Sequence, residues 1–137
     1  MSHVRVMVVL LFFGLSLTGC KGTTRPEPKR YPVSGTVTID GKPLPSGKVH
    51  FKTVAAGSID TVEVKDGAFS GQAEAGDRRV EVSSTQEVKN PNATPGMGDT
   101  MVEETVAPEF NTKSELTAKV TESGPNEFKF DVKSKAK

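Results

Sequence analysis

The sequence predicts an all-β protein, a roughly seven-stranded Greek-key β-sandwich that occupies residues 32–133. Three observations favour this class. Apolar and polar residues alternate in several short segments that are rich in β-branched residues. Gly, Pro, Asn and Asp separate these segments at intervals of about 8–12 residues. No segment of the domain keeps the 3.6-residue apolar period of an amphipathic helix over a useful length.

The first two strands are predicted on either side of a proline-rich turn. Residues 32–40 (PVSGTVTID) alternate β-branched and polar side chains, which is typical of a half-buried strand. Asp40-Gly41 then predicts a hairpin turn. Pro43 and Pro45 exclude a helix or a central strand directly after it. The alternation resumes at residues 48–54 (KVHFKTV), which we expect to be the second strand.

Three more strands are predicted before residue 85. Residues 59–64 (IDTVEV) form the third, and residues 68–72 (AFSGQ) form a short fourth strand across the turn at 65–67 (KDG). Residues 78–84 (RRVEVSS) form the fifth. This spacing of strand, turn and strand favours a sandwich or barrel over a mixed α/β fold.

Residues 85–107 have no sustained period and contain two prolines, two glycines and two asparagines, which predicts a long loop with strand pairing near 102–106. The last two strands, 114–122 (SELTAKVTE) and 127–133 (EFKFDVK), are expected to form a C-terminal hairpin. The predicted core consists of the inward-facing apolar residues Val33, Val37, Ile39, Val49, Phe51, Val62, Val64, Phe69, Val80, Val82, Leu116, Val120, Phe128 and Phe130.

Residues 1–19 have the three-part layout of a bacterial secretory signal peptide. Arg5 gives the basic start, residues 6–15 are apolar apart from Gly14, and small residues follow. The apolar run is shorter than the about 20 residues that a membrane-spanning helix needs. A buried core helix or a short anchor helix is the alternative, but nothing downstream offers it a helical partner.

The only cysteine of the chain ends this segment, in Leu17-Thr18-Gly19-Cys20. This tetrapeptide resembles the lipobox of bacterial lipoproteins. The resemblance implies that the Cys20 thiol takes a diacylglyceryl group and that signal peptidase recognises Leu17, Thr18 and Gly19. Two acyl chains hold a protein stably on a membrane, at about 0.8 kcal/mol per buried methylene. An unmodified cysteine in a secreted protein is the alternative.

Cleavage before Cys20 would leave 118 residues of the 137, enough for one domain with a modest core. These hold 17 Lys and Arg against 17 Asp and Glu, so no basic excess points to nucleic acid. Residues 20–31 carry the lipid and a polar, proline-containing stretch that we expect to be a flexible tether. The basic tail at 134–137 is expected to be solvated and frayed.

Few residues of the chain are suited to catalysis or to metal binding. His50 is the one histidine after the signal segment, so a His/Cys zinc site is excluded, and no cofactor or metal is expected. His50 with a nearby Ser and Asp is the one route to a nucleophilic triad, but its strand position favours a solvent-facing role. Glu103-Glu104 are better explained as solvated carboxylates. Asp-Gly pairs are explained by turn formation without a metal.

The long loop at 85–107 is the candidate binding element, because long loops in compact domains are often functional. It holds the apolar residues Met97, Met101 and Val102. These residues either pack over one end of the sandwich or form a contact surface for a partner.

The segment YPVSGTVTIDGKPLPSGKVHF, residues 31–51, resembles small lipoproteins of planctomycetes whose domain is similar to the carboxypeptidase regulatory domain. The matching features are V-x-G-x-V, D-G-K-P-L, G-x-V-x-F and D-G-x-F. A closing segment, PEFN at 108–111, looks like the family's P-x-x-F/Y-N and is followed by N-x-F-x-F. The resemblance covers nearly the whole mature chain and implies a transthyretin-like or Ig-like sandwich. The middle turn, VKDGAF, is shorter than the usual T-D-x-D-G-x-F, so a cation held by clustered aspartates there has little support.

We therefore expect a non-catalytic, lipid-anchored structural or protein-interaction module of the cell envelope. A binding protein for a carbohydrate or peptide, acting through 85–107 and the loops at the sandwich end, is the second hypothesis. An enzyme is the third. The predicted partners are the membrane, through Cys20, and an envelope protein or glycan. Lys21 takes the position at which Asp retains some lipoproteins in the inner membrane, which favours the outer membrane.

Overall fold

The structure, a computed structural model, describes residues 26–136 except for residues 56 and 97. This part of the chain contains β-strands and one short 3-10 helix, η1 (Pro108–Phe110), and no α-helix. The all-β prediction is therefore confirmed. The strands are β1 (Arg30–Ile39), β2 (Lys42–Pro43), β3 (Ser46–Lys52), β4 (Ile59–Lys65), β5 (Ala68–Glu74), β6 (Gly76–Ser83), β7 (Thr85–Lys89), β8 (Thr100–Glu104), β9 (Thr117–Val120) and β10 (Glu127–Val132).

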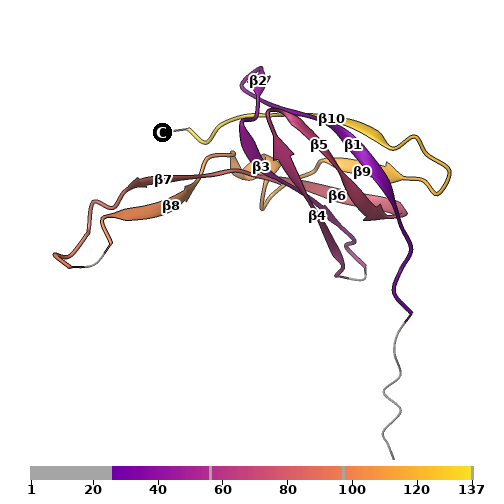
Figure 1. The fold of residues 1–137 in the computed structure, drawn as a ribbon, viewed down its shortest axis with the longest axis horizontal. Helices are drawn as coiled ribbons and strands as arrows, with labels where there is room; N and C mark the ends of the chain where they lie inside the picture. The colour runs from indigo at the N-terminus through magenta and orange to yellow at the C-terminus, as the bar shows by residue number, and fades with distance from the viewer. Residues whose placement is uncertain (1–25, 56, 97, 137) are drawn as a thin grey trace, which may run out of the picture.

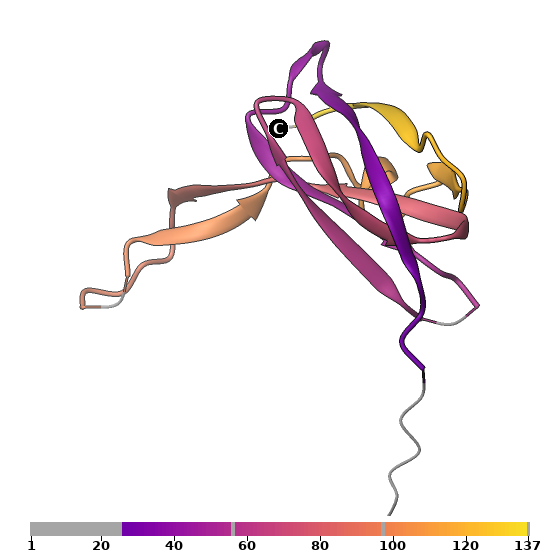
Figure 2. The same cartoon turned by 45° about the vertical axis from the view of Figure 1, so that its right-hand side comes forward.

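Seven strands run in one curled sheet in the order β10-β1-β5-β4-β3-β6-β9, and β2 pairs with the end of β1. The sheet folds over at β4 and β5, which pair only beside their turn, at Val64↔Phe69 and Lys65↔Ala68. Away from this turn, β5 pairs with β1, and β4 pairs with β3. Two layers result, β10-β1-β5 and β4-β3-β6-β9, and they enclose the core (Figure 1 and Figure 2).

The core follows the predicted alternation. Eleven of the fourteen predicted residues are buried, and Ile39, Leu116 and Phe128 are partly buried against them. Four phenylalanine rings form a closed ring of contacts with centroids 6.0–6.2 Å apart, within the range of favourable aromatic pairs. The buried apolar residues outside the prediction are Leu44, Ala73, Val106, Ala107, Ala118 and Val132.

Both predicted Asp-Gly turns are confirmed as two-residue hairpin loops. Asp40 and Gly41 have φ of 51° and 79°, and Asp66 and Gly67 have φ of 50° and 78°. Two successive positive φ values define the type I′ turn, whose twist matches that of the flanking strands. These turns connect β1 to β2 and β4 to β5.

The predicted C-terminal hairpin is wrong. β9 pairs with β6, and β10 pairs in parallel with β1, with Val37 opposite Phe130. The two strands therefore form the opposite edges of the curled sheet. Alternation shows which face of a strand is buried but does not identify its neighbour. The domain boundary also moves, because β1 begins at Arg30 and not at 32.

A polar network fills the space where β4 and β5 separate. The Arg78 guanidinium, only 3% exposed, donates to the Glu74 carboxylate at 2.9 Å and to two backbone carbonyls. Asp60 accepts from Arg30 at 2.7 Å and from the Glu74 backbone N–H at 2.9 Å, and Ser58 donates to Glu74. Buried charges are tolerated when they are paired and hydrogen-bonded in this way. The network takes the place of the missing β4–β5 ladder.

The chain enters and leaves the sandwich at different ends. Arg30, which starts β1, contacts Asp60, and Asp60 lies opposite Phe51. Ser84, which follows β6, donates to the Ser46 carbonyl at the start of β3. Ser46 and Phe51 are five residues apart along β3, about 17 Å. The segment at 26–29 therefore arrives at one end and residues 85–104 leave from the other (Figure 1).

Candidate functional site

Residues 85–104 form a projecting hairpin, which we call the arm. Its strands β7 and β8 pair only with each other in the described part of the chain, with Val88 opposite Met101. Both views show the arm extending away from the sandwich (Figure 1 and Figure 2). The prediction of an irregular loop at 85–107 is thus wrong for its two strands, although pairing near 102–106 was expected.

The apolar residues of the arm do not cover the sandwich. Met101 is 45% exposed and Val102 is 65% exposed. The register places Met101 beside Val88 on one face and Val102 beside Glu87 on the other. The structure therefore does not bring Met101 and Val102 together, and Met97 lies outside the described residues. Val88, which the sequence analysis did not single out, is the apolar neighbour of Met101.

The root of the arm is fixed to the sandwich by Glu104. One carboxylate oxygen accepts from the backbone N–H of Ser84 at 2.8 Å and of Val106 at 3.1 Å. The other accepts from the Ser83 hydroxyl and from Asn111 Nδ2 at 3.4 Å. Carboxylates that accept several donors make charge-assisted, directional contacts. The direction in which the arm leaves the sandwich is therefore set by these bonds.

The C-terminal tail also contacts the root, contrary to the expectation that it is frayed. Ser134 forms a bridge with Val106, and the Lys135 backbone N–H donates to the Thr105 carbonyl at 2.8 Å. The Lys135 ammonium lies 3.6 Å from Glu103. Glu103 and Glu104 point to different partners, so they do not form a carboxylate pair suited to acid–base chemistry.

A shallow trough follows β3 on the outer face of the sandwich. It consists of three adjoining hollows of about 370, 330 and 220 Å³. The first and second hollows share Ser83, and the second and third share Lys52 and Ile59. We call it the β3 trough. Its floor includes Lys48, His50 and Lys52, whose side chains alternate with the buried Val49 and Phe51.

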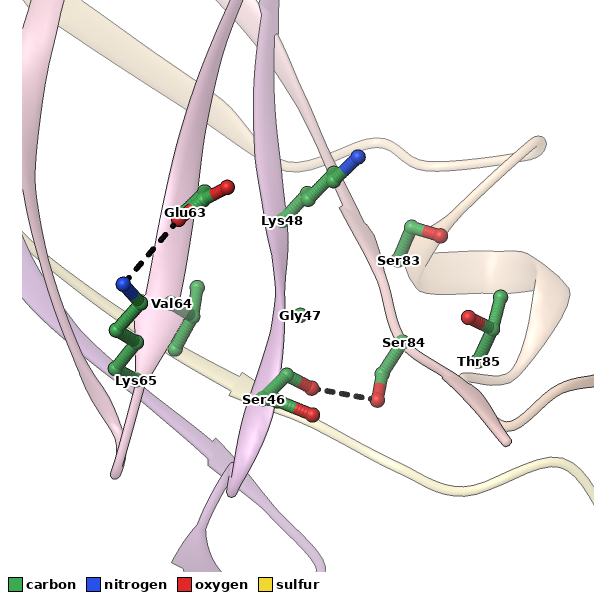
Figure 3. A pocket seen from close by; sticks show the side chains of 9 residues that line it. All are labelled: Ser46, Gly47, Lys48, Glu63, Val64, Lys65, Ser83, Ser84 and Thr85. Carbon is green, nitrogen blue, oxygen red and sulfur yellow. Dashed lines mark hydrogen bonds and ion pairs between the residues drawn. The ribbon is translucent and has the colours of Figure 1, made fainter. Parts of the chain in front are cut away.

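The hollow at the start of β3, between Ser46 and Thr85, is drawn in Figure 3. Lys65 reaches Glu63 along β4, with 3.5 Å between the charged atoms, and Ser84 reaches back to Ser46. Lys48 stands between these two contacts and takes part in no ion pair found among the described residues. The trough thus presents both basic and acidic groups.

The middle hollow surrounds His50. Its Nδ1 lies 2.9 Å from the Thr61 hydroxyl, and burial of the ring, followed by the charge of Lys52, lowers the pKa of His50 below its ordinary value. Glu81 is 5% exposed and accepts from Lys52 and Arg79. Burial alone would raise the pKa of Glu81, but the hydrogen bond from Lys52 and the nearby cations outweigh it and lower that pKa.

These groups do not form a nucleophilic triad in the described residues. The Ser83 hydroxyl donates to Glu104, and the hydrogen-bond partner of His50 is a threonine. No group of three His, Cys, Asp or Glu side chains suited to a metal occurs in the part of the chain that the structure describes. Asp40 accepts from the Ser134 backbone N–H at 3.1 Å. Hydrogen bonding from the side chain of Ser134, followed by this backbone bond, lowers the pKa of the Asp40 carboxyl.

The predicted lipidation residue Cys20 and the recognition residues Leu17, Thr18 and Gly19 lie outside the described residues. Within the described range, none of the elements is a helix that could cross a membrane. In comparisons with known proteins, no family model, no curated protein and no solved structure matches this chain.

Proposed function

We propose that this protein is a non-catalytic, lipid-anchored module of the cell envelope that binds a partner through its arm. The observation that carries the proposal is the placement of the arm at the end of the sandwich away from the chain's entry at Arg30. An anchor at Cys20 would hold the entry end near the membrane. The exposed residues of the arm would then be presented on the far side.

The arm itself supports a binding role. A two-stranded hairpin that packs on nothing is marginally stable in water. Met101 and Val102 nevertheless expose apolar surface on both of its faces. Glu104 supplies a rigid attachment that a mere surface loop does not need. Partner contact explains the exposed apolar residues and the fixed root together.

We also propose membership of the planctomycete-type lipoproteins with a carboxypeptidase-regulatory-like, transthyretin-like domain. The support is the order of the sequence motifs and their roles in the sandwich. Both D-G pairs are type I′ turns. Asn111, the last residue of the closing segment PEFN, donates to the Val82 carbonyl at 2.9 Å and so attaches that segment to β6.

The anchoring part is tested by fractionation and mass spectrometry of the wild type and of Cys20→Ala. We expect the wild type to carry an acylated N-terminal cysteine and to sediment with membranes. The variant should escape acylation and either keep its signal segment or leave the membrane. An unmodified Cys20 in the wild type would refute the anchor.

The binding part is tested by placing a photo-crosslinking amino acid at Met101 or Val102 in cells. The matched control carries the same group at Lys129, an exposed position on β10 of the sandwich. We expect defined crosslinked species from the arm positions and none of the same mass from the control. Identical patterns from the arm and from β10 would contradict a binding role for the arm.

The β3 trough favours a second candidate function, the binding of an envelope carbohydrate or an extended peptide. Its hollows adjoin one another along a seven-residue strand, and Glu104 of the arm and Asn111 line the middle one. A glycan array and a thermal-shift screen test this function. A true ligand should lose affinity in His50→Ala, which keeps the arm intact.

A further inference from the structure

Among the described residues, the edge of β7 that faces away from β8 pairs with no strand and has a defined pattern of outward backbone groups. The Asn90 N–H donates to the Asp99 carbonyl, and the Thr105 N–H donates to the Ser84 carbonyl, each at 2.8 Å. In an antiparallel pair, hydrogen-bonded and non-hydrogen-bonded positions alternate. Val88 therefore bonds to β8, whereas the N–H and C=O groups of Glu87 and Lys89 point away from it.

The sequence around Val88 is complementary to itself when read in the antiparallel direction. We propose that β7 pairs antiparallel with β7 of a second copy of this chain, about a two-fold axis at Val88. Glu87 then lies opposite Lys89 of the second copy, and Lys89 lies opposite Glu87 of the second copy. The outward backbone groups of these two residues make the hydrogen bonds between the copies.

The side chains on both faces fit this register. On one face the existing pair of Met101 and Val88 is extended by Val88 and Met101 of the second copy, so four apolar side chains form one row. On the other face two opposite-charge pairs form across the interface. Each apolar or charge pair of this kind stabilises a sheet by about 0.2–1 kcal/mol.

The edge of β8 is less suitable. A two-fold axis at Val102 would place Met101 opposite Glu103 of the second copy, an apolar side chain against a charged one. A two-fold axis at Met101 would place Glu103 opposite Asp99, which is a repulsive pair. On the β7 side, Pro91 has no N–H and limits the pairing to the region of Glu87–Lys89.

The pairing rests on the proposed function in one respect. A short edge-to-edge contact falls below the area of stable interfaces, so it is weak between freely diffusing molecules. Confining the chain to a membrane raises its effective concentration and favours the pairing. The partner of the arm is therefore a second copy of the chain on the same membrane.

Disulfide trapping of the full chain in its own membranes tests the pairing. In the two-fold register Val88 and its counterpart form a non-hydrogen-bonded pair, with Cα atoms about 4.5 Å apart, within disulfide range. We expect Val88→Cys to give a covalent dimer under mild oxidation. Gln86→Cys, on the same face, is the control, because its counterpart lies about 13 Å away.

The second measurement reverses the charges of Glu87 and Lys89 in the Val88→Cys variant. Glu87→Lys alone, or Lys89→Glu alone, places like charges opposite each other and should slow trapping about tenfold. The double variant Glu87→Lys/Lys89→Glu restores attraction and should recover the original rate. Failure of the double variant to recover, or trapping of Gln86→Cys as fast as Val88→Cys, would overturn the inference.

The outcomes separate this inference from the proposed function. Crosslinks from Met101 to a different protein, without trapping at Val88, would overturn the pairing of copies and leave the arm as a binding element. Trapping at Val88 in Cys20→Ala at matched total concentration should be weaker than in the anchored chain. Equal trapping would refute the role of the membrane in the pairing.

Discussion

The side-chain amide of Asn126 pairs with both backbone groups of Thr121. Its Oδ1 accepts from the Thr121 N–H at 2.7 Å, and its Nδ2 donates to the Thr121 carbonyl at 3.0 Å. Nδ2 also donates to the Pro32 carbonyl at 3.0 Å, and the Asn126 carbonyl accepts from the Ser34 N–H at 2.9 Å. One buried side chain therefore links the segment after β9 to β1 and β10, where the two edges of the curled sheet approach each other.

Replacing Asn126 should be costly. Asn126→Ala removes four hydrogen bonds that a buried side chain makes to Thr121 and Pro32, and we expect a loss of about 2–3 kcal/mol in the free energy of unfolding. Urea unfolding measures the loss. Asn92→Ala, at an exposed turn in the arm, is the control and should change stability by less than about 0.5 kcal/mol. Equal losses would show that the link at Asn126 contributes nothing.

Gly35 should not tolerate a side chain. A Cβ there would lie 1.8 Å from the Phe128 carbonyl oxygen and 2.9 Å from the Phe69 ring, so β10 would have to move away from β1. We expect Gly35→Ala to lose more than about 3 kcal/mol. Gly41→Ala, with no atom within 4 Å but a positive φ of 79°, should lose about 1 kcal/mol. Because the chain has no tryptophan, thermal unfolding is followed by far-UV circular dichroism. Equal losses of stability in the two variants would contradict the prediction.

The stability of the fold should depend on pH through His50. Its pKa in the folded state is below the ordinary value of 6.5, so the unfolded chain binds the proton more tightly. Stability should therefore fall as the pH decreases from about 7.5 towards 5, by less than about 1 kcal/mol because solvent screens a half-buried ring. His50→Gln should remove this dependence. Asp40 and Glu81 have lowered pKa values and act at lower pH. A wild-type profile that is flat above pH 5 would be inconsistent with a perturbed His50.

The arm should be separable from the fold. Joining Thr85 to Glu104 through two glycines removes residues 86–103, which pair only with each other among the described residues. We expect the midpoint of urea unfolding to change by no more than the equivalent of about 1 kcal/mol. Glu104→Ala, which removes acceptors for the Ser84 and Val106 N–H groups, should cost about 1–3 kcal/mol. A larger loss from the deletion than from Glu104→Ala would mean that the arm packs on the sandwich.

The sequence was sufficient to predict the strands whose apolar side chains alternate and the turns that contain Asp-Gly pairs. β1, β3, β4 and β10 were found because valine and phenylalanine mark every second position. Apart from the hairpins at the two Asp-Gly turns, the pairing partners of the strands were not found, because the same alternation fits a strand beside any neighbour. β10 joins β1 in parallel, and no local signal encodes that choice. β7 was missed because TQEVK has a single apolar residue and so shows no period.

The candidate site was predicted less completely than the fold. Met101 and Val102 were singled out from the sequence, which left open whether they pack over the sandwich or contact a partner. The structure leaves both exposed, and their placement on opposite faces follows from the register with β7. Glu81 was missed because a glutamate at an outward position normally remains in water. It is buried here because Lys52 and Arg79 come from neighbouring positions across two strands and cover it. Such an arrangement depends on two strands, β3 and β6, that lie far apart in the sequence.

Because the chain enters the sandwich at the end opposite to the arm, the distance between the arm and an anchoring membrane has an upper limit. If Cys20 is the anchor, the ten residues at 20–29 span at most about 35 Å, and the ten residues of β1 add about 33 Å. The root of the arm can therefore stand no more than about 70 Å above the lipid surface. On that condition, a partner that the arm binds lies within this distance of the lipid surface.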